Sequence, residues 1–503
     1  MLEGFATIEG TRAWAEKHPE LMFGRLGHTG LFTSPAGFGC YRVAKGVADH
    51  ESALRLALQS GINLVDTSSN YADGGSERLV GQMLAEAVDA GVLTRDQVVV
   101  VSKVGYLQGE NYALSQARKQ RGEGFKEVVE YAEGLEHCIH PEFLEDQLTR
   151  SLQRLELEVL DVLLLHNPEY YLSLAHRQGV DLSEARLIYY QRLLSAFDHL
   201  EQEVERGRLR WYGVSSNTFG GNDQAADFTS LDELLELAQA RPEGNHMAVI
   251  QLPLNLLEPG AVVNANQSGG RSVLELARDK NIAVLVNRPL NAMDNRQMLR
   301  LAEIESEKTY SDDEIINAIG AFRKSEKSFT HHLLPKLNVP MPMMQRLGEQ
   351  LCVGDQLKFY WRNFGNYERW RQSKAGFFLP RVQGVFQFLD QHKDDVEGLG
   401  HWMDGHHHRL DEVLSAVESL YAGEARRRVQ AMRRNVRQAD PSWGESRTLS
   451  QMAIRAVRST HGVSAVLVGM RRTDYVEDVL TELRRPIEQE DRSASWAKLA
   501  APG

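Results

Sequence analysis

Eight short apolar runs, separated by helix-like segments, are the feature that most restricts the fold of this sequence. The runs lack the two-residue alternation of a half-exposed strand, so we expect both faces of each strand to be buried, as in a parallel sheet. This number of strands, alternating with amphipathic helices, favours a closed (β/α)8 barrel of the TIM type over an open α/β sheet. The runs are SPAGFGCYRV, INLVD, QVVVVSK, VLDVLLLH, LRWYGVSS, MAVIQLPLN, IAVLVNRPL and VSAVLVGM.

Composition excludes several classes of protein. The chain of 503 residues is 42% hydrophobic and 25% charged, as expected for an ordinary globular protein. Its formal net charge of −12 argues against a nucleic-acid partner or an anionic membrane surface, because both require a basic face. The three cysteines are too scattered for a disulfide or zinc framework. Without a signal-peptide core or a long apolar run, we expect a cytoplasmic protein that does not span a membrane.

Polar side chains stand at the carboxyl ends of several expected strands. Active sites of (β/α)8 barrels lie at this end, among the loops that follow the strands. One such residue alone can be a helix cap or a satisfied polar group of the core. Their convergence on one rim favours a functional site. The residues are Asp66, Lys103, His166, Ser215, Ser216 and Gln251.

The same stretches resemble the aldo-keto reductases. GINLVDTSSNYADGGSERLVGQML, VVVVSK and VLDVLLLHNP are similar, in residues and in order, to the segments that carry the Asp, Tyr, Lys and His tetrad of that family. Position by position, the resemblance places the tetrad at Asp66, Tyr71, Lys103 and His166. It implies a (β/α)8 barrel formed by residues 24–290 and 447–490, with residues 1–23 as an amino-terminal extension.

The tetrad has a clear chemical interpretation. Hydride transfer to a carbonyl leaves an alkoxide, to which Tyr71 would give a proton. An ammonium at Lys103 would lower the pKa of that phenol, and Asp66 would keep the lysine charged and oriented. His166 would donate a hydrogen bond to the carbonyl oxygen, where negative charge develops. We therefore expect an NADP(H)-dependent oxidoreductase that interconverts a small-molecule carbonyl (aldehyde, ketone or sugar) and an alcohol, with Tyr71 as general acid and base.

The resemblance also implies which residues bind NADP(H). No GxGxxG motif follows a strand, so the cofactor would be held without a Rossmann fold. The family holds the nicotinamide carboxamide with a Ser-Asn pair and a Gln, and this chain offers Ser215, Ser216 or Asn217, and Gln251. Arg471 and Arg472 are either a solvated helix start or, as we expect, a site for the 2′-phosphate, which favours NADP(H) over NAD(H). The other residues assigned to the cofactor are Cys40, Tyr41, Arg288, Gly469, Tyr475 and Asp478.

Two positions depart from the family pattern. The aromatic residue that usually stacks on the nicotinamide is matched by Asn287, so flat stacking is lost or supplied from elsewhere. The neighbouring Arg288 would then contact the pyrophosphate or an acidic substrate. The family's Glu-Asn contact to adenine reads Asp478-Val479, and the lost amide predicts weaker cofactor binding.

The largest departure is the segment from residue 291 to residue 446, between the seventh strand and its helix. Its many aliphatic and aromatic residues predict a folded, mainly helical insertion on the catalytic rim, where loops that follow strands emerge. With a second excursion at 105–139, it would form a lid that shapes the substrate pocket or a contact in a homo-oligomer. Within it, GHHHRLDE has adjacent histidines without the i, i+4 spacing of helical metal ligands, so we expect a solvated turn and no metal site.

Two alternatives share this barrel. The same tetrad can run in the oxidative direction, as a dehydrogenase of a sugar or secondary alcohol. The barrel can also serve as a nucleotide-sensing regulatory protein, an interpretation that the insertion supports and the complete tetrad opposes. The sequence does not distinguish among carbonyl substrates.

Overall fold

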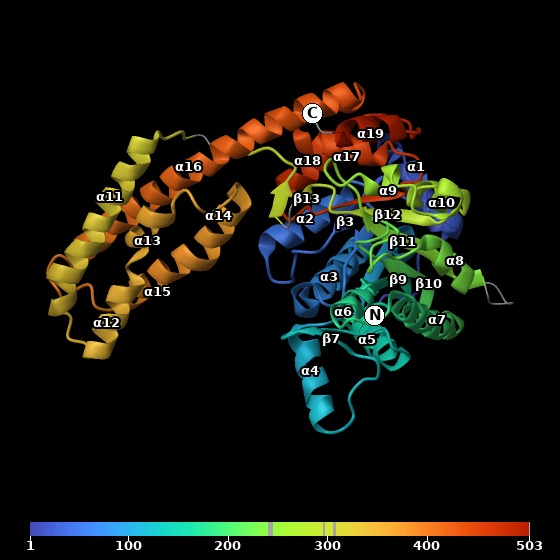
Figure 1. Cartoon of the computed structure of the whole chain (residues 1–503), viewed down its shortest axis with the longest axis horizontal. Coiled ribbons are helices and arrows are strands. Elements are labelled where there is room, and N and C mark those ends of the chain that lie inside the picture. Colours follow the sequence, from blue (N-terminus) through green and yellow to red (C-terminus); the bar gives the residue numbers. More distant parts are fainter. Residues whose placement is uncertain (240–244, 295–296, 305–307, 502–503) are drawn as a thin grey trace. The chain divides into compact units, whose positions relative to one another are not determined.

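The barrel predicted from the apolar runs is confirmed. The computed structural model describes residues 1–239, 245–294, 297–304 and 308–501. Eight strands close into one barrel in the order β3-β4-β5-β9-β10-β11-β12-β15, with parallel neighbours. Figure 1 labels β3, β9, β10, β11 and β12 among them. Each of the eight strands falls on one of the predicted runs. They are β3 (Ala36–Gly39), β4 (Leu64–Asp66), β5 (Val99–Val104), β9 (Leu160–His166), β10 (Leu209–Ser215), β11 (Met247–Pro253), β12 (Ala283–Asn287) and β15 (Ala465–Val468).

Helices alternate with these strands, as the sequence pattern predicts. Their apolar stripes are buried; in the helix that follows β3, for example, Ala53, Leu54, Ala57 and Leu58 are all buried. This outer layer explains why the strands have no polar face. The alternating helices are α2 (Ala48–Gln59), α3 (Gly75–Asp89), α5 (Pro141–Leu155), α7 (Leu182–Glu205), α8 (Leu231–Gln239), α10 (Val273–Asp279), α17 (Leu449–Arg458) and α18 (Thr473–Leu483).

Further helices and strands lie outside the eight barrel strands and the helices that alternate with them. The hairpin of β1 (Gly24–Arg25) and β2 (Phe32–Thr33) carries Leu26 and Leu31, which pack with side chains of the barrel strands. In α1 (Ile8–Lys17), buried Trp14 donates from Nε1 to the carbonyl oxygen of Gly61 at 3.0 Å. The others are β6 (Tyr106–Leu107), α4 (Gly109–Gln120), β7 (Val129–Ala132), β8 (Leu135–His137), α6 (Tyr170–Arg177), α9 (Gly260–Val263), β13 (Asn291–Asp294), β14 (Gln297–Arg300) and α19 (Ser493–Ala500).

Strand β10 has an irregularity that sets the register of the site. Its pairing with β11 shifts between Tyr212 and Gly213, and Ser215 then lies opposite Gln251. A Cβ atom on Gly213 would lie 1.6 Å from the carbonyl oxygen of Val249, so only glycine permits this approach. On its other side, Ser215 pairs with His166 of β9.

The chain divides into two compact units. One comprises Met1–Gln297 and Asn435–Gly503, and the other is Met298–Arg434. The second unit is mainly helical and has its own core, in which Phe322, Trp370 and Val413 are fully buried. Its helices are α11 (Asp312–Ser328), α12 (Met341–Gln350), α13 (Val353–Tyr360), α14 (Tyr367–Ser373), α15 (Leu379–Asp390) and most of α16 (Leu399–Ala439).

The solvated turn expected at the three adjacent histidines is wrong. His406 to His408 lie inside α16, and the side chain of His406 is fully buried. Its ring stacks on Phe322 and Trp402, each at 4.6 Å between centroids. Tertiary packing of this aromatic group outweighs the low helix propensity of Gly405. Among the described residues, no group of three His, Cys, Asp or Glu side chains is arranged to hold a metal ion.

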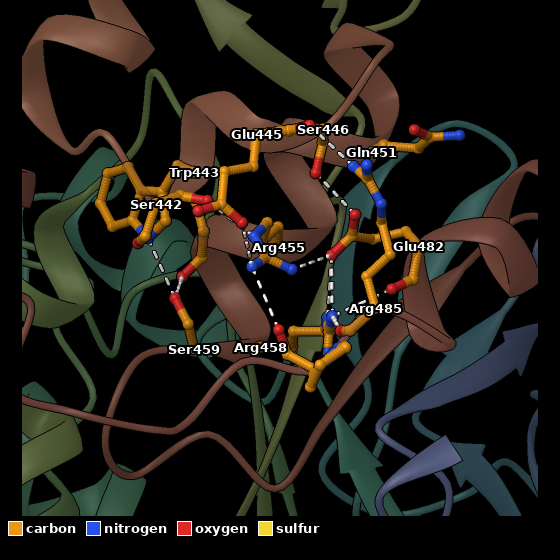
Figure 2. Close-up of polar contacts among 12 residues, drawn as sticks. Ser442, Trp443, Glu445, Ser446, Gln451, Arg455, Arg458, Ser459, Glu482 and Arg485 are labelled. Atoms are coloured by element: carbon orange, nitrogen blue, oxygen red, sulfur yellow. Dashed lines mark hydrogen bonds and ion pairs between the residues drawn. The ribbon is translucent and has the colours of Figure 1, made fainter. Parts of the chain in front are cut away.

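A buried charge network joins the last two helices of the barrel (Figure 2). The carboxylate of Glu482 on α18 accepts hydrogen bonds from Arg455 at 3.1 Å and from Arg458 at 2.8 Å, both on α17. Its other oxygen accepts from Ser446 at 2.6 Å. Arg455 also donates to the carbonyl oxygen of Ser442 at 2.7 Å. The network thus fixes the segment that leads into α17.

Among the residues that the structure describes, no helix combines the length and the apolar character needed to cross a bilayer.

Candidate active site

The structure brings the four predicted tetrad residues together at the carboxyl ends of neighbouring strands. Asp66 ends β4, Lys103 lies near the end of β5 and His166 ends β9. Tyr71 begins the short turn Tyr71–Gly74 that follows β4. In parallel pairing, these strand ends lie at one level of the barrel, so residues far apart in sequence converge.

Lys103 links the acid and the phenol. Its Nζ donates to Asp66 Oδ2 at 2.7 Å and to the carbonyl oxygen of Thr67 at 2.8 Å. The same Nζ lies 3.4 Å from the Tyr71 hydroxyl and 4.9 Å from the centre of its ring. A buried ammonium thus stands beside the phenol oxygen, where it stabilises negative charge.

Burial and charge act in opposite directions on the pair of Lys103 and Asp66. Burial opposes the charged form of Lys103, but Asp66 and Tyr71 outweigh it and raise the pKa of Lys103. Burial also raises the pKa of Asp66, against the lowering by Lys103 and by the hydrogen bond from Gln251. A charged lysine is therefore present beside Tyr71 at neutral pH.

The phenol of Tyr71 is held protonated. Burial raises the pKa of Tyr71 to about 12, although the charge of Lys103 lowers it. The sequence predicts a lowered pKa; the lysine acts in that direction, and the greater effect of burial reverses the net shift. At neutral pH the Tyr71 hydroxyl is therefore an acid with its proton in place.

The backbone after Tyr71 has an unusual conformation. The next two residues, Ala72 and Asp73, have φ of 49° and 54°, values that are uncommon for residues with a side chain.

His166 is neutral and enclosed by rings. Burial lowers the pKa of His166 well below its ordinary value, and the nearby charge of Lys103 lowers it further. The ring of Tyr106 packs edge-on against it at 4.7 Å, and the ring of Tyr71 at 5.9 Å. The backbone carbonyl oxygen of His166 lies 2.7 Å from Nε2 of His137. Burial lowers the pKa of His137 to about 4. The imidazole can therefore take part in hydrogen bonds only as a neutral donor or acceptor.

A second polar group adjoins the tetrad. Gln251 donates from Nε2 to Asp66 Oδ1 at 2.8 Å, and its Oε1 accepts from Ser215 at 3.2 Å and from Asn287 at 3.3 Å. The Oδ1 atom of Asn287 is buried and has no hydrogen-bond partner among the described residues. A buried polar atom without a partner is costly, and this one lies beside groups suited to an amide ligand.

Comparison with known proteins decides the family. A sequence model described as the aldo/keto reductase family matches residues 37–313, more than half of the chain. The chain belongs to the aldo/keto reductase family.

Two relatives illustrate the range of this family. The chain is 28% identical over 284 residues to a 6-dehydroglucose reductase of Novosphingobium aromaticivorans, which covers 52% of the chain and 74% of the relative. It is 28% identical over 199 residues to an NADH-specific methylglyoxal reductase of Escherichia coli, and the match covers 37% of this chain and 55% of that relative.

A solved aldo/keto reductase structure from Klebsiella pneumoniae, in complex with NADP and acetate, is similar as well. It is 19% identical with a TM-score of 0.34, and the match covers 53% of this chain and 68% of that one.

Three further residues that the resemblance assigns to the cofactor lie just after barrel strands, Cys40 and Tyr41 after β3 and Ser216 after β10. Cys40, just after β3, is buried, and burial raises its pKa, so it is not a reactive thiolate. Tyr41 is 63% exposed, and the centre of its ring lies 5.2 Å from that of the Tyr71 ring. Ser216 is buried with its Oγ 3.0 Å from Thr218 Oγ1.

Three assigned residues are engaged within the protein. Arg288 donates to Glu258 at 2.9 Å, so a contact to the pyrophosphate would compete with this ion pair. Asp478 accepts from Ser450 at 2.5 Å and from Gln451 at 2.7 Å, at the start of α17. Arg472 is the residue before α18 and donates to Asp474 at 2.8 Å. Its neighbour Arg471 precedes it, Gly469 follows β15, and Tyr475 lies in the first turn of α18.

Sequence reasoning missed several polar groups beside the tetrad. Ser68 and Asn70 stand in the quoted stretch DTSSNY, yet nothing in it shows that Ser68 would face His166. Gln108 contacts Asn70 from the segment after β5, at a distance of 3.1 Å. Glu169 is buried near Ser216, and burial raises its pKa to about 7. Only the proximity of strand ends in a barrel could have indicated these pairs.

Proposed function

We propose that this protein is an NADP(H)-dependent oxidoreductase that interconverts a carbonyl compound and an alcohol by hydride transfer. The observation that carries the proposal is the buried pair of Lys103 and Asp66, with the lysine 3.4 Å from the Tyr71 hydroxyl. Such a pair keeps a positive charge where the phenol loses its proton, and His166 lies on the same rim.

Tyr71 would act as the general acid in reduction. Hydride addition to the carbonyl carbon produces an alkoxide, which takes the phenol proton and becomes the alcohol. The developing phenolate is stabilised by the ammonium of Lys103. Because the phenol is protonated at neutral pH, reduction needs no prior proton transfer, whereas oxidation requires the phenolate first.

The nicotinamide group would be held by side chains adjoining the tetrad. Ser215 and Gln251 offer a hydroxyl and an amide, and the unpartnered Oδ1 of Asn287 offers an acceptor for an amide N–H. When bound, the nicotinamide supplies the hydride. Asn287 replaces a stacking aromatic ring, so this chain would orient the carboxamide more by hydrogen bonds than by stacking.

Preference for NADP(H) rests on Arg471 and Arg472. Guanidinium groups beside a helix amino terminus suit a phosphate monoester. A relative of Meyerozyma guilliermondii that is 25% identical over 264 residues is an NADPH-dependent D-xylose reductase, whereas the Escherichia coli relative is NADH-specific. Together with the 6-dehydroglucose reductase, these relatives support a sugar or small aldehyde or ketone as substrate.

A carbonyl panel followed by loss of NADPH absorbance tests the proposal. Tyr71→Phe should remove most turnover and keep NADPH affinity, because the phenol acts only in the transition state. Tyr171→Phe, a change of the same size on α6, should leave both unchanged. Turnover of Tyr71→Phe within a few-fold of wild type would refute this role. NADPH binding without any turnover by the wild type would support the nucleotide-sensing alternative instead.

A further inference from the structure

The hydroxyl of Ser68 lies among three hydrogen-bond partners beside the tetrad. Its Oγ is 2.7 Å from Asn70 Oδ1 and 3.1 Å from His166 Nδ1. The carbonyl oxygen of Lys103 lies 3.3 Å away. Ser68 is fully buried, so water does not compete for these contacts. A hydroxyl has one proton to donate, so only one of the three groups can accept it.

Gln108 orients the amide of Asn70. Asn70 donates from Nδ2 to Gln108 Oε1 at 3.1 Å, which directs its own Oδ1 toward Ser68. Ser68 donates to that oxygen, its shortest contact, and its Oγ is left to accept from Nδ1–H of His166. The same result follows if Ser68 donates to the carbonyl oxygen of Lys103. In both cases the neutral imidazole carries its proton on Nδ1, and Nε2 is an acceptor.

We propose that Gln108, Asn70 and Ser68 form a relay that sets the tautomer of His166 and must invert before His166 can donate to a substrate oxygen. On inversion, Gln108 donates to Asn70 Oδ1, and Asn70 donates to Ser68. Ser68 then donates to Nδ1. For this the imidazole gives up its Nδ1 proton to solvent and takes one up at Nε2, so it stays neutral and its proton resides on Nε2. Only this form can stabilise the developing alkoxide, and in this respect the inference rests on the proposed function.

Inversion needs no movement of the backbone. Turning each amide about its last bond exchanges an oxygen and a nitrogen at nearly the same positions.

A second contact joins the segment that carries Asn70 to the segment that carries Gln108. The N–H of Glu110 donates to both carboxylate oxygens of Asp73, at 3.1 and 3.2 Å. Gly109 permits this approach, because it has a φ of +55° and a Cβ there would lie 2.4 Å from Asp73 Oδ1.

The first experiment reads the tautomer directly. Nitrogen NMR of the ligand-free protein labelled at histidine, assigned by comparison with His166→Gln, distinguishes a protonated from a bare ring nitrogen. We expect the proton on Nδ1 in the wild type and a shift toward Nε2 in Ser68→Ala, which removes the acceptor. A proton on Nε2 in the wild type, or a tautomer unchanged by Ser68→Ala, would overturn the proposal. No substrate or cofactor is used, so this result is independent of the proposed activity.

The second experiment compares two changes at Gln108. Gln108→Glu keeps the acceptor for Asn70 but cannot donate while ionised, so it locks the relay, whereas Gln108→Met releases it. We expect kcat/KM of Gln108→Glu to fall about tenfold below that of Gln108→Met. The fall should be equal in both directions, because reduction and oxidation share one transition state. NADPH affinity should be unchanged in both variants. Ala113→Glu on α4 controls for the added charge.

The locked variant also has a signature in its pH dependence. As the pH falls toward the ordinary carboxyl pKa of about 4.3, Glu at position 108 gains a proton that it can donate to Asn70. The rate of Gln108→Glu, relative to Gln108→Met, should therefore recover on acidification. Similar rates for the two variants at all pH values would overturn the relay while leaving the proposed reductase activity in place. Absence of turnover in the wild type would refute that activity, with the NMR result still deciding the tautomer.

Discussion

Lys103 donates a 2.7 Å hydrogen bond to Asp66, and both side chains are buried beneath the rim of the barrel. Removing two charges from water is costly, and their attraction offsets this only when the geometry is good. Lys103 also donates to the carbonyl oxygen of Thr67 at 2.8 Å and lies 3.4 Å from the Tyr71 hydroxyl. A pair of this kind contributes little net stability, so its presence beside Tyr71 is better explained by the charge that it places there.

The pair gives a stability prediction that is separate from activity. Lys103→Met leaves Asp66 buried without its counterion and should lower the free energy of unfolding by about 3–5 kcal/mol. Adding Asp66→Asn should restore most of this loss, although neither variant should turn over substrate. Urea unfolding followed by circular dichroism measures both values. If the double variant were as unstable as Lys103→Met, the cost would come from lost packing and not from an unpaired charge.

The raised pKa of Tyr71 predicts different pH profiles for the two directions. A phenol with a pKa of about 12 is protonated from pH 6 to 9, so the titration of Tyr71 should not change kcat/KM for reduction over that range. Oxidation needs the phenolate, so kcat/KM for oxidation should rise about tenfold per pH unit over the same range. Glu169, with a pKa of about 7, is the group expected to cause any inflection near neutrality, and Glu169→Gln should remove it. A reduction rate that falls steadily from pH 6 would contradict the assignment.

The barrel could be predicted because its signal is local. Buried strands between amphipathic helices appear in the sequence as apolar runs, and barrel geometry then places Asp66, Lys103 and His166 on one rim. Contacts made across the fold could not be predicted. The engagement of Arg288 by Glu258 depends on how two loops meet, and the net pKa shift of Tyr71 depends on burial that no motif reveals. His406 appeared polar in the sequence and lies in an aromatic core.

Two arginines should determine the choice of cofactor. Changing both Arg471 and Arg472 to Ala should weaken NADPH binding by about tenfold or more and spare NADH, because only NADPH carries the 2′-phosphate. Fluorescence titration with each cofactor measures the two affinities. Arg484→Ala, at the far end of α18, is a matched control for loss of a guanidinium. Equal losses for NADPH and NADH would show that these arginines do not recognise the phosphate.

The buried network at α17 and α18 should be sensitive to one carboxylate. Glu482→Gln leaves Arg455 and Arg458 without a buried counterion and should lower the free energy of unfolding by about 3–5 kcal/mol (Figure 2). Glu445→Gln removes the exposed partner of Arg455 and should cost less than about 1 kcal/mol. Chemical unfolding of the two variants makes the comparison. Similar small effects would mean that the backbone carbonyl contacts suffice for the arginines.

The helical unit Met298–Arg434 should have a stability that changes with pH in two opposite ways. Burial lowers the pKa of His406 from 6.5 to about 3, and the charges of Arg409 and His407 add to this. The unfolded chain therefore binds a proton that the folded unit excludes, and stability should decrease as the pH falls from about 6.5. Burial raises the pKa of Glu326 from 4.5 to about 8, so stability should increase as the pH falls from about 8 toward 4.5.

Together, His406 and Glu326 predict a plateau in the pH dependence of the free energy of unfolding of this unit. The free energy of unfolding should rise by about 1.4 kcal/mol per pH unit from pH 8 to 6.5, stay level to about 4.5 and then fall. His406→Phe should extend the rise down to about pH 4.5, and Glu326→Gln should remove it. Because Trp402 stacks on His406 at 4.6 Å, the resonance of a fluorinated Trp402 reports unfolding of this unit by denaturant at each pH. A pH profile that neither substitution changes would show that other groups in the unit control its titration.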